Sequence, residues 1–238
     1  MRIRHLNVIF AFILVPIAAF GQSRNTSALD GLWDGARNTQ DLVQLMKADG
    51  QPIPFTDRGL QSQRSIDYAK NPNGFCLPPG PSRAITGPSP FQIVQSPDII
   101  AILFENHFVY RIIYVNSKHP DDINEYPAFM GHSTGKWQGD TLIVDTVGIK
   151  AGTWLDSNGL EHSEKLQLTE TFQRAGVDLI HYTAAYDDPV MFTKPWTLKL
   201  DLKRQTNTRI LEYVCQENEK DSQKLKSTPK TAARGSRP

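Results

Sequence analysis

Acidic side chains alternate with apolar ones in the segment 162–174, and this pattern is the first sign of chemistry in the chain. Side chains two residues apart in a strand point to the same side. Glu164, Glu170 and, if the strand begins there, His162 therefore share a side with the apolar residues of the segment, which are Leu166, Leu168 and Phe172. The pattern predicts two carboxylates and an imidazole directed toward an apolar interior.

A carboxylate on an apolar face is costly to bury unless it is paired. Burial and neighbouring charge also shift pKa values, so a buried cluster can supply a general acid and a general base. An internal salt-bridge network that closes the end of a barrel is the alternative. Our catalytic candidates are Glu164, Glu170 and His162. Our ligand-binding candidates are Arg111, His119, His132, Trp154 and Tyr182.

The segment Gly131-His132-Ser133-Thr134-Gly135 matches the Gly-x-Ser-x-Gly pattern of a hydrolase nucleophile, and Asp156 and His162 follow in hydrolase order. That motif needs a strand before the serine and a helix after it. Here a strand, a hairpin and a second strand follow instead. We therefore interpret the segment as a glycine-bounded loop that enters a strand.

The histidines do not show the i, i+4 spacing of a helical zinc motif. We expect neither a metal nor another cofactor. The alternative is a zinc or iron site assembled across strands from His119, His132, His162 and Glu164.

Aromatic residues are a further candidate lining for a pocket that takes an apolar or aromatic small molecule. The set comprises Trp137, Trp154, Trp196, Tyr110, Tyr114, Tyr182 and Tyr186. Ordinary core packing is the alternative for each of them.

The elements that must position these residues are short strands. Runs of β-branched and aromatic residues alternate with Gly, Asn, Asp and Pro clusters from residue 91 onward. We predict strands at 30–35, 91–95, 99–104, 108–115, 135–138, 141–147, 163–174, 178–186, 196–203 and 209–215. The Pro- and Gly-rich stretch 51–90 predicts an ordered wrapping loop with one short helix near 60–69. The fold class is all-β, an antiparallel barrel or sandwich with a lipocalin-like meander.

Both ends of the chain differ from its middle. Arg2 and Arg4 precede an apolar run to Phe20, and Ala19-Phe20-Gly21 resembles a cleavage site, so 1–21 is predicted to be a signal peptide. Residues 219–238 form a basic, polar tail that we expect to be disordered. The single domain is predicted to span 22–218. The protein is then periplasmic or extracellular, with no transmembrane segment in its mature part.

The charge of the domain bears on its binding partners, and its cysteine content predicts a disulfide. Residues 22–218 carry 18 Lys and Arg against 23 Asp and Glu, so the domain is mildly acidic and nucleic acid is not an expected partner. Cys76 and Cys215 are an even pair in a chain predicted to be exported, and we expect them to form a disulfide. Two buried, unpaired thiols are the alternative.

The chain resembles a family of uncharacterised secreted proteins of Gram-negative bacteria. The resemblance is carried by Gly-His-Ser-x-Gly-x-Trp-x-Gly-Asp-Thr-Leu-x-Val-Asp-Thr at 131–146, Thr-Trp-Leu-Asp at 153–156, His-Ser-Glu at 162–164 and Glu170. His119-Pro120, the segment 193–197 and both cysteines also fit. The family implies export but no named activity. One departure is Gln216, where the resemblance implies a histidine after the last cysteine.

These observations support three functions. The first is an exported small-molecule-binding barrel with an inward-facing His, Glu and Arg cluster. The second is an acid-base or metal-assisted enzyme of the lyase, isomerase or hydrolase type that acts on a small apolar or aromatic substrate. The third is an envelope interaction protein that uses its rim and basic tail. Fold class alone does not choose between a carrier and a catalyst.

Overall fold

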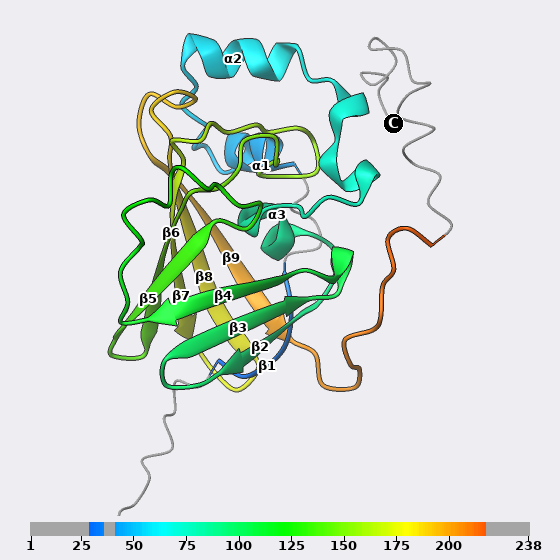
Figure 1. Cartoon of the computed structure of the whole chain (residues 1–238), viewed down its shortest axis with the longest axis vertical. Coiled ribbons are helices and arrows are strands. Elements are labelled where there is room, and N and C mark those ends of the chain that lie inside the picture. Colours follow the sequence, from blue (N-terminus) through cyan, green and yellow to red (C-terminus); the bar gives the residue numbers. More distant parts are fainter. Residues whose placement is uncertain (1–28, 36–40, 218–238) are drawn as a thin grey trace, which may run out of the picture.

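The computed structural model describes residues 29–35 and 41–217 and shows a closed β-barrel (Figure 1). Within these residues nine strands follow one another around the ring, and β1 closes it by pairing with both β2 and β9. The strands are β1 (Gly31–Asp34), β2 (Phe91–Gln95), β3 (Ile99–Phe104), β4 (Tyr110–Val115), β5 (His132–Gln138), β6 (Thr141–Val147), β7 (Gln167–Arg174), β8 (Leu179–Asp187) and β9 (Trp196–Arg204). The expectation of an all-β barrel is confirmed.

One strand pair departs from the antiparallel meander that the sequence predicts. β4 and β5 are parallel, whereas the other neighbouring pairs of the described barrel are antiparallel. A parallel pair cannot be joined by a tight hairpin and needs a crossover. Residues 116–131 form this crossover over the outside of β5 and β6. The N–H of Asn116 donates to the carbonyl of Gly135 at 2.7 Å, and the N–H of Ala128 donates to the carbonyl of Gly148 at 2.9 Å.

The inside of the barrel is filled by the inward residues of the strands. Leu142, Val144, Leu168, Phe172 and Leu198 are fully buried there, as the two-residue alternation predicts. The turn between β5 and β6 is the predicted one, with Gly139 at φ +62. A packed core of this kind supports side chains of defined orientation on both faces of the sheet.

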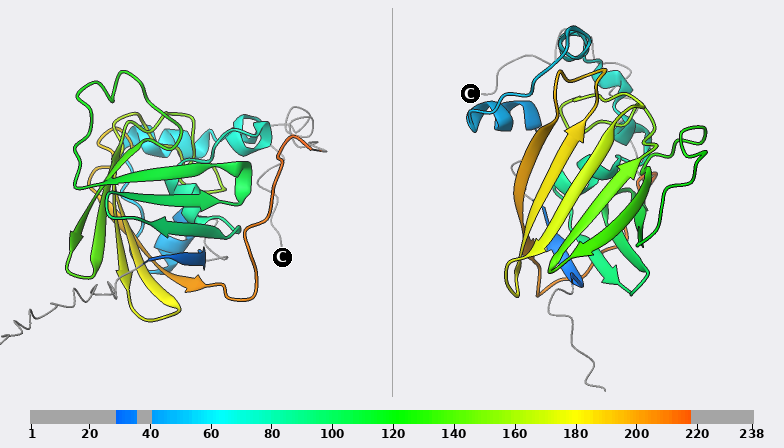
Figure 2. Two further views of the ribbon diagram at one scale, coloured as in Figure 1. Left: turned by 60° about the horizontal axis from the view of Figure 1, so that its bottom comes forward. Right: turned by 90° about the vertical axis from the view of Figure 1, so that its left-hand side faces the viewer.

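Short helices cover one end of the barrel, as Figures 1 and 2 show. They are α1 (Leu42–Ala48), α2 (Asp57–Arg64), η1 (Tyr68–Lys70), η2 (Pro72–Phe75) and α3 (Pro81–Thr86), and η3 (Asn106–Phe108) lies between β3 and β4. Thr56 caps α2 by accepting the N–H of Gly59 at 3.1 Å. The wrapping loop predicted at 51–90 is therefore partly helical. α2 starts and ends earlier than the predicted helix at 60–69, and α1 and α3 were not expected.

The described helices are all too short or too polar to cross a bilayer. The predicted signal peptide at 1–21 and the predicted tail at 219–238 lie outside the described residues.

Cys76 and Cys215 form a disulfide, with Cα atoms 5.6 Å apart, so the predicted pairing is confirmed. The segment that leads to Cys215 is not the strand predicted at 209–215, because residues 205–214 have no regular structure. The reason lies in the closure of the barrel. β9 already pairs with β1, so no edge remains open to accept another strand.

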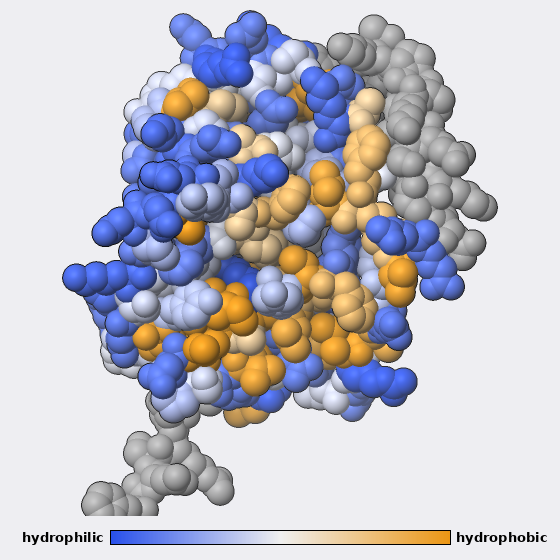
Figure 3. All heavy atoms as spheres, in the orientation of Figure 1, coloured by the Kyte–Doolittle hydropathy of each residue, from blue (hydrophilic) through white to orange (hydrophobic). Residues whose placement is uncertain are grey.

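The outer face of β2, β3 and β4 is unusually apolar (Figure 3). Its outward positions hold no charged residue and comprise Gln92, Val94, Ile99, Ala101, Leu103, Tyr110, Ile112 and Tyr114. Tyr110 is 65% exposed and Phe108, just before β4, is 62% exposed. On β9, by contrast, Lys199, Asp201 and Lys203 face outward. Large exposed apolar patches mark interaction surfaces more often than chance.

Candidate functional site

A buried ion pair crosses the inside of the barrel. Arg111 of β4 is 2% exposed and Glu170 of β7 is fully buried. Arg111 Nη1 donates to Glu170 Oε1 at 3.0 Å, and Nη2 donates to Oε2. The hydroxyl of Tyr182 on β8 donates to the same Oε1 at 2.8 Å. The structure therefore brings together three of the residues selected from sequence.

Hydroxyl groups from two more strands complete this network. Arg111 Nε donates to Ser133 Oγ of β5 at 2.9 Å, and Nη2 donates to Thr146 Oγ1 of β6 at 2.6 Å. The two hydroxyl oxygens lie 3.0 Å apart. Ser133 is the serine of the Gly-x-Ser-x-Gly pattern. Its side chain faces the barrel interior from within a strand, which agrees with our interpretation of that pattern as structural.

The charges of this network stabilise one another. Burial alone would lower the pKa of Arg111, but the adjacent Glu170 outweighs it, and the pKa of Arg111 lies above its ordinary value. Burial raises the pKa of Tyr182, and Glu170 raises it further. Arg111 stays cationic and Tyr182 stays neutral near neutral pH. This is the arrangement of the internal salt-bridge alternative, in which the groups satisfy each other without a ligand.

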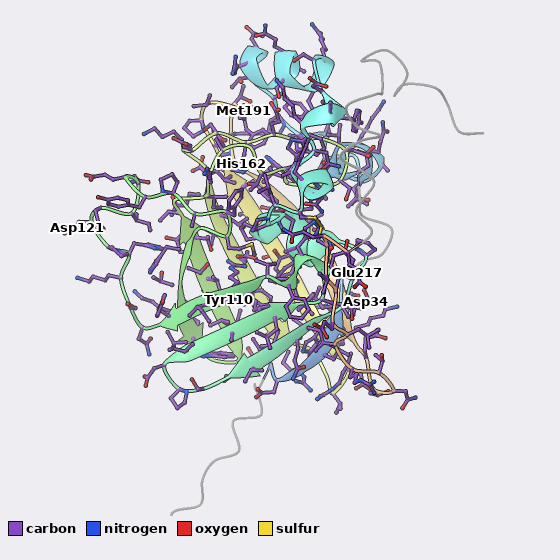
Figure 4. All side chains as sticks on the ribbon, turned by 45° about the vertical axis from the view of Figure 1, so that its right-hand side comes forward. Asp34, Tyr110, Asp121, His162, Met191 and Glu217 are labelled. Atoms are coloured by element: carbon purple, nitrogen blue, oxygen red, sulfur yellow. A yellow bond between two sulfur atoms is a disulfide. The ribbon has the colours of Figure 1, made fainter. Side chains whose placement is uncertain are left out.

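His162 does not join the ion pair. It lies in the loops at the helix-covered end of the barrel, where Figure 4 labels it. Its Nε2 lies 2.6 Å from Thr153 Oγ1, and its Nδ1 lies 2.8 Å from the carbonyl oxygen of Ser163. Burial lowers the pKa of His162, which the hydrogen bond to Ser163 opposes. The imidazole is 5% exposed, and each of its nitrogens lies within hydrogen-bond distance of a group in the neighbouring loop.

Glu164 is exposed in a turn, so the expectation that it points into the barrel is wrong. β7 begins only at Gln167, and the two-residue alternation does not extend back past it. Asp188 explains the break, because it accepts the N–H of Ser163 at 2.6 Å and the hydroxyl of Ser163 at 2.8 Å. These bonds turn the chain away before the strand starts. The three catalytic candidates therefore do not form one site.

Trp154 also lies away from the ion pair. Its ring meets Tyr68 edge-on at 6.0 Å between ring centroids, and the guanidinium of Arg83 lies 5.7 Å from its centroid. Burial lowers the pKa of Arg83 to about 10, although the charge of Asp156 opposes the shift. Trp154 is part of the packing of the helix-covered end.

The other two ligand-binding candidates meet on the outside of the barrel. His119 of the crossover and His132 of β5 have their Nδ1 atoms 2.8 Å apart. His119 Nε2 lies 3.2 Å from Asp145 Oδ2 of β6 and 3.3 Å from Thr134 Oγ1. His132 stacks on Tyr114 at 5.2 Å between centroids. We call Asp145, His119 and His132 the histidine chain.

Hydrogen-bonding rules fix the protons in the histidine chain. A carboxylate only accepts, so Nε2 of His119 carries the proton that Asp145 receives. In the neutral ring the Nδ1 of His119 is then an acceptor, and His132 must donate from its own Nδ1. The Nε2 of His132 is left as an acceptor, with no hydrogen bond to any other described residue. Burial lowers the pKa of His132, and His119 lowers it further.

The metal alternative does not assemble. Among residues 29–35 and 41–217, no group of three or more His, Cys, Asp or Glu side chains is placed to hold a metal ion. His119 and His132 are together, but His162 and Glu164 are elsewhere.

The pockets of the described surface lie outside the ion-pair network. An apolar groove of about 330 Å³ lies between β3–β4 and residues 210–212, and a pocket of about 340 Å³ lies beside His119 and Asp145. A larger pocket of about 670 Å³ is lined by Met46 of α1, the segment 50–54 and residues 194–197. We call it the Trp196 pocket. Arg111, Glu170 and Tyr182 line none of these three.

Trp196 has an unusual feature in this pocket. The residue is 6% exposed, and its indole N–H is buried with no acceptor among the described residues. Its ring stacks on Tyr186 at 4.1 Å between centroids and meets Phe192 edge-on at 5.6 Å. Buried donors in native proteins are nearly always paired, so this N–H is an exception among the buried polar groups of the barrel end.

Two residues of these networks, Thr146 and Asp145, were not among our candidates, although the alternation of the sequence indicates their directions. The pattern of 141–147 places Thr146 inward with Leu142 and Val144, and Asp145 outward. Nothing in the sequence indicates that His119 of the crossover reaches Asp145, because that contact depends on the parallel β4–β5 pair. Trp196 belongs to the predicted aromatic set, but its unpaired N–H is visible only in three dimensions.

No protein-family model matches this chain, and no curated protein matches its sequence. Function must therefore be inferred from the geometry.

The ion pair predicts a contrast between two glutamates. Glu170→Gln leaves the buried cation of Arg111 without its counter-charge and should lower the free energy of unfolding by about 3–5 kcal/mol. Glu164→Gln, in an exposed turn, should change it by less than about 0.5 kcal/mol. Urea unfolding measures both. The double variant Arg111→Met/Glu170→Met should recover most of the loss, and equal stability of Glu170→Gln and wild type would refute the structural role.

The histidine chain predicts defined tautomers and a pH dependence. At pH 7.5, nitrogen NMR of the imidazoles should find the proton of His119 on Nε2 and that of His132 on Nδ1. Because the folded-state pKa of His132 is lowered, its contribution to stability is complete above the unfolded value of about 6.5 and is lost as pH falls below it. His132→Gln should therefore make the acid-side fall in unfolding free energy shallower. A proton found on Nε2 of His132 at pH 7.5 contradicts the assignment.

Proposed function

We propose that this chain is an exported small-molecule-binding barrel protein whose ligand occupies the Trp196 pocket. The observation that carries the proposal is the pocket itself, which is lined by Met46, residues 50–54 and residues 194–197. The pocket, at about 670 Å³, is within the size range of ligand sites.

The Trp196 pocket replaces the barrel interior as the place of binding. The sequence directs attention to the interior because Arg111, Glu170 and Tyr182 point there. These groups already bond to one another and to Ser133 and Thr146. A ligand would have to break that network in order to bind there, whereas the Trp196 pocket lies outside the network and can be filled without breaking it.

Export is part of the same proposal. Its support is the basic and apolar N-terminal sequence together with the Cys76–Cys215 disulfide, because disulfides persist mainly in oxidising compartments.

A second function is favoured by a separate observation, the uncharged outer face of β2, β3 and β4. We propose that this face attaches the protein to an anionic lipid bilayer. The apolar groove beside it is formed with residues 210–212, and the chain then continues past Glu217. Residues 219–238 carry six Lys and Arg against two Asp and Glu. Stable attachment to a bilayer usually needs two signals, and an apolar surface with a basic segment supplies both.

Ligand binding predicts a response of the Trp196 indole. In a screen of single-ring aromatic acids, amides and alcohols, at least one compound should shift the indole N–H resonance that Trp196→Phe removes. For ligands of about nine non-hydrogen atoms, the expected Kd is on the order of millimolar. The indole of Trp33, which donates to the carbonyl of Leu29 at 2.8 Å, is the internal control and should not shift. No shift with any compound would refute the proposal.

Membrane attachment predicts salt-sensitive binding to vesicles. The chain 22–238 should sediment with vesicles of phosphatidylglycerol and phosphatidylcholine at 50 mM NaCl, and less at 500 mM because the charge term is screened. The double variant Phe108→Ser/Tyr110→Ser should lose most binding, and ending the chain after Glu217 should remove the salt-sensitive part. Val177→Ser, at a 73% exposed apolar residue in the β7–β8 turn, is the matched control.

Two results would overturn the membrane proposal. Vesicle binding that Phe108→Ser/Tyr110→Ser leaves unchanged would place the contact elsewhere. Absent vesicle binding, together with a dimer that the same variant dissociates, would assign the face to a second copy of this chain.

A further inference from the structure

The histidine chain ends in a nitrogen atom that carries neither a proton nor a hydrogen bond. His132 donates from its Nδ1 to His119 Nδ1 across 2.8 Å, so its Nε2 keeps a free lone pair. This Nε2 has no partner among the described residues, yet it is not one of their buried unpaired atoms. His132 is half-buried, and its Nε2 is therefore open to solvent.

The other members of the histidine chain hold this imidazole in one tautomer. His119 Nε2 donates to Asp145 Oδ2 at 3.2 Å, and Asp145 Oδ1 accepts from Gln167 Nε2 at 2.9 Å. Tyr114 of β4 stacks on the ring of His132, with 13° between the two planes. A carboxylate behind an imidazole fixes its tautomer and stabilises the imidazolium that forms when the ring accepts a proton. In this chain the effect reaches His132 through a second imidazole.

The surroundings of His132 favour an apolar substrate. Tyr114 belongs to the uncharged outer face of β2, β3 and β4, and it pairs in register with Ile99 of β3. Residues paired across two strands point to the same side of the sheet. Tyr114 and Ile99 are each 41% exposed. The imidazole therefore stands at the border of an exposed apolar surface, which offers a contact for the apolar part of a substrate.

We propose that His132 is a general base that activates water for the hydrolysis of carboxylic esters with an apolar acyl group, and that His119 and Asp145 are its positioning residues. Nε2 takes a proton from a water molecule while the water oxygen bonds to the ester carbonyl carbon. The bond from that carbon to the alcohol oxygen then breaks, and the leaving oxygen takes the proton from Nε2. The products are an acid and an alcohol, and His132 returns to its starting form. This activity goes beyond both proposed functions and does not depend on the Trp196 pocket.

The titration of His132 should appear in the rate. Burial and the neighbouring His119 lower the pKa of His132, so its ring is neutral and accepts protons near neutral pH. The titratable groups in contact with it are His119 of the crossover and Tyr114 of β4, and Asp145 of β6 acts through His119. The rate should therefore rise with pH through a pKa below the ordinary value of about 6.5 and then level off.

Hydrolysis of para-nitrophenyl butyrate by the intact protein tests the base. His132→Gln should lower kcat/KM by about tenfold or more, because general-base catalysis contributes at least that much. His181→Gln is the matched control and should leave the rate unchanged. His181 is an exposed histidine outside the histidine chain, and its Nδ1 lies 2.7 Å from a carboxylate oxygen of Asp201. The reaction of the unaltered protein should be slower in heavy water, because a proton moves in the rate-limiting step.

Asp145→Asn separates positioning from a merely structural role. The asparagine oxygen still accepts from His119 but carries no charge, so His132 becomes a weaker base. The plateau of the rate should fall severalfold, and the pKa of the pH–rate profile should move lower. A structural role would change stability without moving that pKa. Asp145 is partly exposed, so this variant keeps the proposal testable even if His132→Gln does not fold.

Acyl chain length tests the apolar contact. The butyrate ester should react about threefold faster than the acetate ester, once each rate is divided by the rate of the same ester with free imidazole. Ile99→Ser should reduce this preference, whereas Val177→Ser, in the β7–β8 turn, should keep it. If the two esters react equally, the assignment of an apolar acyl group is wrong.

Three results would overturn the general base. The first is an equal rate for His132→Gln and the unaltered protein. The second is an equal loss in His132→Gln and His181→Gln, which would mark ordinary catalysis by exposed imidazoles. The third is an acyl-imidazole intermediate together with equal rates in water and heavy water, which would make His132 a nucleophile. Each of these results leaves ligand binding in the Trp196 pocket to its own test.

Discussion

The ion pair between Arg111 and Glu170 is the constraint on which the rest of the barrel depends. Two charges inside an apolar barrel are tolerable only if each finds its partner and its hydrogen bonds. The guanidinium is bonded to side chains from β5, β6 and β7, and β8 adds the hydroxyl of Tyr182. Strand register, side-chain direction and closure of the ring must therefore all be correct at once for this pair to form.

The ion pair also limits which polar groups inside the barrel are available to a ligand. Its groups fill the middle of the barrel and leave no polar anchor unbonded for a ligand there. The pockets near β3–β4, His119 and Trp196 lie outside this network. Neighbouring residues of β5 and β6 take part in different networks, one inside the barrel and one outside it. Ser133 and Thr146 point inward to Arg111, while Thr134 and Asp145, directly beside them in the chain, point outward to His119.

Sequence reasoning predicted the barrel class, most strands, the disulfide and the inward position of Glu170, because these follow from local alternation and cysteine count. It misplaced Glu164, since a capping interaction from the distant Asp188 ends the alternation before that residue. It did not anticipate the parallel β4–β5 pair, and so it could not see the contact between His119 and Asp145. The unpaired N–H of Trp196 could not be predicted either, because the absence of a nearby acceptor depends on the three-dimensional packing around the indole.

The parallel pair β4–β5, which we call the parallel seam, divides the barrel wall into two groups of strands. β2 to β4 and β5 to β9 are each built from strands that follow one another with antiparallel pairing, whereas β4–β5 joins them through a long crossover and β1 links their far ends. Contacts between sequence neighbours form at small entropic cost, and contacts across long loops form more slowly. Arg111 belongs to the first group and each of its side-chain partners belongs to the second. The guanidinium therefore adds a side-chain link across the parallel seam that the backbone pairing of β4 with β5 also bridges.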